Sequence, residues 1–133
     1  MTRLLGAVAL RALPAIAGTG LLLLGAASLL VPGRFMGQVG LESIEALGLN
    51  FMRGDVAASL IVIGALAWRA ARLGDGRLLD IPLIWAALVI AGRTLGLFAD
   101  PDGMAQVRAL VPGLILAALM LPPRMWLRPA ARD

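Results

Sequence analysis

Four long apolar stretches constrain this chain more than any other feature. A helix needs about 20 mostly apolar residues to cross the hydrocarbon core of a bilayer. The chain offers such stretches at about residues 12–31, 49–68, 81–99 and 104–121. The last is interrupted by Arg108 and Pro112, so we expect a kink or a late helix start there. The sequence therefore predicts four membrane-spanning helices.

The composition agrees with a membrane location. Hydrophobic residues make up 60% of the 133 residues and charged residues 15%. Ordinary soluble domains contain roughly 45–50% and about 25% of these classes. The mean hydropathy is +0.90. A soluble domain of this size has too little interior to cover so much apolar surface, whereas a bilayer removes the problem.

The residue inventory excludes several kinds of chemistry. Cysteine and histidine are both absent, so the chain has no thiol nucleophile and lacks the commonest general base and zinc ligand. Neither a G-x-G-x-x-G nor a P-loop motif occurs, so nothing suggests nucleotide binding. We therefore predict no metal and no cofactor, and we favour a protein that is not an enzyme.

The arginines predict how the chain is oriented. Eight arginines lie before the first span, between the second and third, and after the fourth, which must share one side of the membrane. They are Arg3, Arg11, Arg69, Arg72, Arg77, Arg124, Arg128 and Arg132. The opposite side holds Arg34 in its first loop. The positive-inside rule then places both termini, including a basic tail at residues 122–133, in the cytoplasm. The net charge of +4 thus reflects topology, and we expect no nucleic-acid partner.

Tryptophan positions point the same way. Trp68, Trp85 and Trp126 all fall toward the predicted cytoplasmic ends, as expected of an interfacial belt. A basic start followed by an apolar run could also suggest a cleaved signal peptide, but the run is longer than a typical signal segment.

The connections predict the arrangement of the spans. Short turn-forming links such as LGDGR and DPDG make neighbouring helices antiparallel. The first outer loop is longer, and Leu41, Ile44 and Leu47 follow helical spacing in it. We read a short amphipathic helix on the outer surface, with an ordered polar loop as the alternative. The expected fold is all-α, a single integral membrane domain (residues 1–133) built as an antiparallel up-down four-helix bundle.

Polar side chains converge on the predicted outer half of this bundle. The cluster consists of Asn50, Arg53, Asp55, Arg93, Asp100, Glu42 and Glu45. Arg93 would lie roughly 10 Å below the outer surface, where an arginine costs a few kcal/mol unless it snorkels or finds a partner. Three readings stay open for it: a structural tether, a site for a lipid phosphate or substrate carboxylate, or snorkelling. Arg53 and Asp55 favour interfacial anchoring, with Arg34 a candidate partner for Asp55.

One short motif in the third span predicts helix packing. Gly92 and Gly96 form a small-xxx-small pattern, which lets two membrane helices approach closely.

Three motifs carry a family resemblance that covers most of the chain. An N-x-x-RG opens the second span, a GR-x-x-G lies in the third, and a D-x-D-G follows it. The chain resembles the family called domain of unknown function 4345, small bacterial four-helix membrane proteins that are broadly DoxX-like. The matching positions are Asn50, Arg53, Gly54, Gly92, Arg93 and Gly103. The resemblance implies a multi-pass protein of the bacterial inner membrane and makes a shared role for Arg53 and Arg93 more credible. It implies no activity, because the family has none assigned.

Three functions compete. The first is a non-enzymatic accessory or scaffold module whose partners are the lipid bilayer and either another protein or a second copy. The second is an outer-leaflet pocket for a lipid-like or quinone-like molecule, held by Arg53 and Arg93. Glu42, Glu45 or Asp55 would then supply any proton transfer. The third is a small multidrug-type transporter, which the absence of any charge in residues 12–31 disfavours.

Overall fold

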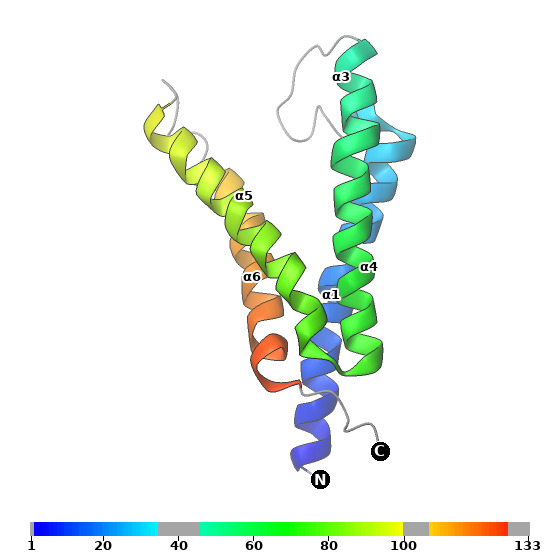
Figure 1. The fold of residues 1–133 in the computed structure, drawn as a ribbon, viewed down its shortest axis with the longest axis vertical. Helices are drawn as coiled ribbons and strands as arrows, with labels where there is room; N and C mark the ends of the chain where they lie inside the picture. The colour runs from blue at the N-terminus through cyan, green and yellow to red at the C-terminus, as the bar shows by residue number, and fades with distance from the viewer. Residues whose placement is uncertain (1, 35–45, 100–106, 128–133) are drawn as a thin grey trace.

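The computed structural model describes residues 2–34, 46–99 and 107–127, and the elements assigned in these ranges are all helices. The elements are α1 (Thr2–Leu30), α3 (Ala46–Phe51), the π-helix η1 (Met52–Val56), α4 (Ala57–Leu73), the 3-10 helix η2 (Gly76–Leu79), α5 (Asp80–Ala99) and α6 (Val107–Trp126). α3, η1 and α4 follow one another without a break and form one long rod (Figure 1). The predicted all-α class is confirmed.

In the described part of the chain, three helices are long and apolar enough to cross a membrane: Gly6–Leu30, Leu49–Leu73 and Gly76–Ala99. They correspond to the first three predicted spans. α1 begins earlier than predicted, at Thr2 rather than near residue 12, and the α4 rod runs on to Leu73 rather than residue 68. The fourth apolar segment, Leu110–Trp126, is shorter. The amphipathic helix predicted over residues 41–49 lies mostly outside the described residues, and its last part belongs to α3.

α6 also runs further than the sequence indicates. It contains Pro112, Pro122 and Pro123 and ends at Trp126, past the predicted end at residue 121. The first residues of the predicted tail are therefore helical. Pro123 is fully buried, and the carbonyl oxygen of Pro123 still accepts a hydrogen bond from the Leu127 N–H at 2.9 Å.

α1 and the α4 rod pack against each other at two glycines. A Cβ built on Gly18 would lie 2.8 Å from the carbonyl oxygen of Gly64, and one built on Gly64 would lie 2.9 Å from that of Gly18. One heptad further along α1, a Cβ on Gly25 would lie 3.2 Å from the carbonyl oxygen of Ala57. The backbones therefore approach as closely as only small residues allow, the packing typical of membrane helices.

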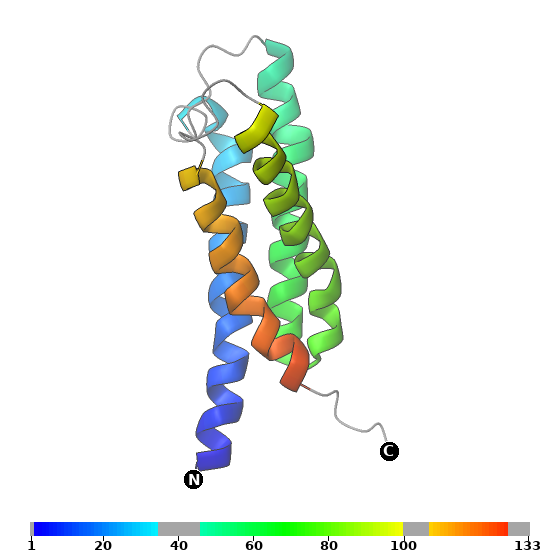
Figure 2. The ribbon, with the colours of Figure 1, turned by 90° about the vertical axis from the view of Figure 1, so that its left-hand side faces the viewer.

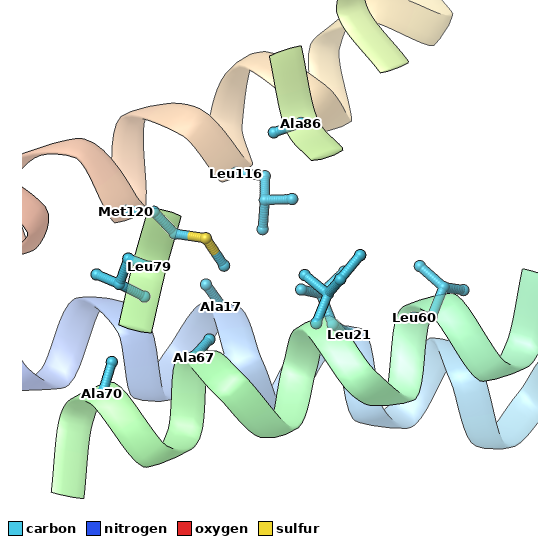
Figure 3. Close-up of a cluster of buried hydrophobic side chains, with 10 residues drawn as sticks. Ala17, Leu21, Leu60, Ala67, Ala70, Leu79, Ala86, Leu116 and Met120 are labelled. Atoms are coloured by element: carbon cyan, nitrogen blue, oxygen red, sulfur yellow. The ribbon is translucent and has the colours of Figure 1, made fainter. Parts of the chain in front are cut away.

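The hydrophobic core lies where all four long helices meet. α1 contributes Ala17 and Leu21, the α4 rod Leu60, Ile63, Ala67 and Ala70, η2 and α5 Leu79 and Ala86, and α6 Leu116 and Met120 (Figure 3). Leu79 and Met120 are the two largest of the fully buried side chains. They lie toward the end of the molecule where α4 turns through η2 into α5, so this end is the better packed.

The opposite end of the molecule is more open. α5 departs from the α4 rod at η2, and Figure 1 shows the two diverging from there. α6 stays with α5 and also contacts α1, which it crosses obliquely in Figure 2. α1 begins and α6 ends at the same end of the molecule as η2 (Figure 1). We call this end, formed by Arg11, Gly74–Asp80 and Pro123–Leu127, the basal junction.

Candidate functional site

The basal junction contains an ion pair between Asp80 and Arg124, which joins the two ends of the α5–α6 hairpin. Arg124 donates from Nε to Oδ1 of Asp80 and from Nη2 to Oδ2, the latter at 3.2 Å. Asp80 opens α5 and Arg124 lies in the last turn of α6, so both charges also suit the helix dipoles.

Two glycines shape the turn at the centre of the basal junction. Gly74 caps α4 with φ of 66°, a left-handed conformation that favours glycine. A Cβ at Gly74 would lie 2.6 Å from Nη2 of Arg11, so the α1 arginine covers this turn. A Cβ at Gly76 would lie 2.8–2.9 Å from the carbonyl oxygens of Pro123, Arg124 and Leu127. The end of α6 thus wraps closely around η2, and the predicted LGDGR turn is confirmed.

A second polar contact ties α1 to the α4 rod. The indole Nε1 of Trp68 donates to Oγ1 of Thr19 at 2.9 Å, and that hydroxyl donates to the carbonyl oxygen of Ala15. This contact fixes the orientation of a partly exposed tryptophan ring next to the Gly18–Gly64 crossing. The sequence predicts an interfacial position for Trp68 but not this hydrogen bond, because Thr19 lies far from Trp68 in the sequence.

The predicted polar cluster is only partly described. Glu42, Glu45 and Asp100 lie outside the described residues. Asn50, Arg53 and Asp55 are exposed at the far end of the α4 rod. The structure therefore tests neither the cluster as a whole nor a shared role of Arg53 and Arg93, and both stay predictions.

The segment that carries Arg53 and Asp55 has an unusual backbone. Residues 52–56, MRGDV, form the π-helix η1, whereas α-helix continues on both sides. Such π-turns are rare and often occur at functional sites. Within η1, Met52 is buried, while Arg53, Gly54 and Asp55 are exposed. The apolar pattern of residues 49–68 predicts a membrane-spanning helix here without a π-turn, so the backbone of η1 differs from that expectation.

Arg93 lies on the inner face of α5. It comes seven residues after the fully buried Ala86, so the two residues share one helix face. The exposed Leu88 and Leu95 lie on the opposite face. Arg93 is half-buried and has an interaction partner. This placement answers a question that the sequence left open, namely whether Arg93 faces the interior or the surroundings.

Gly92 brings no other helix close within the described residues, so its packing role stays a prediction. Gly92 is exposed, and a Cβ there would meet no atom within 4 Å. The reason is rotational: Gly92 lies toward the outer face of α5, so none of the helices described here reaches it. Gly96 is half-buried. The close approaches occur instead at Gly18, Gly25 and Gly64.

No family model, curated protein or solved structure matches this chain. The resemblance to the domain of unknown function 4345 family therefore stays a prediction. In the described ranges, no group of three or more acidic, histidine or cysteine side chains could hold a metal ion.

Proposed function

We propose that this chain is a small integral membrane module, a four-helix antiparallel bundle of the bacterial inner membrane, that acts as an accessory or scaffold subunit rather than as an enzyme. Its surface for a partner helix would be the outer face of α5. The lipid bilayer would cover the remaining apolar surface.

The burial of α5 carries this proposal. Only 11% of the most apolar part of the Gly76–Ala99 segment is buried inside the chain, against 39% for Leu49–Leu73. The outer face of α5 presents a continuous apolar surface made of Ile81, Ile84, Leu88, Leu95 and Phe98, with exposures from 60% to 86%. The exposed Gly92 adds a position at which another helix could approach closely. A helix that contributes little to its own bundle has most of its surface left for lipid or for another protein.

Photo-crosslinking in native membranes tests the proposal. A photoreactive amino acid at Leu88 should yield a discrete protein adduct, and the same amino acid at Val62, 56% exposed on α4, should label lipid. Replacement of Leu88 and Leu95 by alanine should then abolish co-purification of the adduct protein, while Val62→Ala should leave it unchanged. Lipid labelling alone at both positions would refute the scaffold role. An adduct with a second copy of the chain would identify a homo-oligomer.

The inward placement of Arg93 favours a second function, a pocket for a lipid-like or quinone-like molecule in the outer leaflet. A guanidinium on the inner face of a membrane helix is suited to bind a phosphate, carboxylate or carbonyl oxygen. Native mass spectrometry of wild type, Arg93→Gln and Arg108→Gln tests it, since Arg108 is an exposed arginine of α6. An added mass that only Arg93→Gln loses would support the pocket. The same spectrum in all three proteins would leave Arg93 as a structural tether.

A further inference from the structure

The exposed face of α4 carries a stripe that changes from apolar to basic. Ala58, Val62 and Ala65 are exposed and follow one another at spacings of four and three residues. Arg69 and Arg72, also exposed, continue the same spacing to the end of the helix. Residues at such spacings lie on one helix face. The stripe therefore presents an apolar track that ends in two guanidinium groups beside the basal junction.

The acidic groups of the basal junction are already engaged elsewhere. Asp80 is paired with Arg124, and Oδ1 of Asp75 accepts the backbone N–H of Arg77 at 3.0 Å. The hydrogen bonds and ion pairs found in the described residues include neither Arg69 nor Arg72. The two guanidinium groups therefore have donors available for an external anion, and Trp68, four residues before Arg72, is held beside them by Thr19.

The length of the stripe matches one lipid leaflet. An α-helix rises 1.5 Å per residue, so Ala58 lies about 16 Å from Arg69. Half of a hydrocarbon core that is about 30 Å thick is about 15 Å. An acyl chain that follows the apolar track would place its headgroup at the level of the two arginines.

We propose that Arg69 and Arg72 bind the headgroup of an anionic phospholipid whose acyl chain lies along Ala58, Val62 and Ala65. Charge decides the class of ligand. Two neighbouring guanidinium groups attract a headgroup with net negative charge more strongly than a zwitterionic one, and arginine can bind a phosphate through two hydrogen bonds. The apolar track favours a lipid over free phosphate. This inference rests on the proposed placement of the chain in a bilayer.

Lipid competition tests the site. The full chain is purified in a mild detergent with equal amounts of phosphatidylglycerol and phosphatidylcholine, and retained lipids are counted by native mass spectrometry. Wild type should retain phosphatidylglycerol in preference. The Arg69→Gln/Arg72→Gln variant should bind it about 25-fold more weakly, the equivalent of about 1 kcal/mol per arginine. The Arg34→Gln/Arg108→Gln variant is the matched control, since it removes two exposed arginines away from the basal junction, and it should keep the preference.

Three results would overturn the inference: no preference for phosphatidylglycerol in wild type, an equal loss of this preference in the control variant, or displacement of the lipid by inorganic phosphate at the same concentration.

An Arg69→Lys/Arg72→Lys variant controls for misfolding, because it keeps both charges and should keep the preference. Loss of the preference in this variant too would show that the effect is not one of charge. Failure of the chain to insert into phosphatidylcholine vesicles would refute the proposed membrane function, whereas insertion without lipid preference would refute this inference alone.

Discussion

Gly18 and Gly64 set the distance between α1 and the α4 rod, because the carbonyl oxygen of each occupies the space where a Cβ of the other would lie. In lipid, where hydrophobic burial drives little helix association, such close van der Waals packing is a main source of stability. One added methyl group at Gly18 or Gly64 should therefore lower the stability of the protein more than a larger substitution on an exposed helix face.

Gly18→Ala should destabilise the protein by about 1–3 kcal/mol, because the added methyl group must displace backbone atoms of Gly64 and Trp68. Gly20 provides a control on the same helix, since a Cβ there would meet nothing within 4 Å. Gly20→Ala should be neutral or slightly stabilising. Unfolding by a denaturing detergent in mixed micelles measures both. Equal stabilities of the two variants would contradict the close crossing.

The ion pair between Asp80 and Arg124 is half-exposed, so its contribution should be small. We expect a double-mutant cycle with Asp80→Asn and Arg124→Gln to give a small favourable coupling energy, as is typical of ion pairs screened by solvent. Unfolding curves of the four proteins provide the measurement. A coupling energy near zero would mean that the end of α6 is held by packing around Gly76 alone.

At the scale of elements, the four helices differ in what they contribute. α1 and the α4 rod form a closely packed pair, whereas α6 contacts both α1 and α5 and joins the two halves of the molecule. Met120 is the central contact of α6, because it is fully buried in the core cluster (Figure 3). The stability of the assembly should therefore depend on the inner face of α6.

Met120→Ala should cost about 2–5 kcal/mol, the range for truncation of a large buried side chain. Met125 on the same helix is 65% exposed, so Met125→Ala should cost well under 1 kcal/mol. The comparison uses one residue type on one helix, and detergent unfolding of both variants checks it. Similar losses of stability in the two variants would mean that the core does not lie between α6 and α1.

At the scale of the whole molecule, the basal junction gathers Arg11 of α1, the start of α5 and the end of α6, and the arginines near the end of α4 lie beside it. The positive-inside rule predicts that this end faces the cytoplasm. Reporter fusions after Gly76 and after Gly103 should give a cytoplasmic and an external signal, respectively. The reverse pair of signals would mean that the basal junction faces the outside. Two signals from the same side would exclude a membrane crossing by α5.

The sequence by itself determined the helical class, three long apolar helices and the turn at residues 74–76. These properties are local: apolar runs, a glycine at a helix end and an aspartate that accepts the backbone N–H two residues later act within a few residues. The tertiary structure alone decided which glycines bring helices together, that Arg124 pairs with Asp80, and that Arg93 faces inward. Such contacts depend on how each helix is rotated about its axis. That rotation is set by packing against partners far away in the chain, so neither motif nor spacing could reveal it.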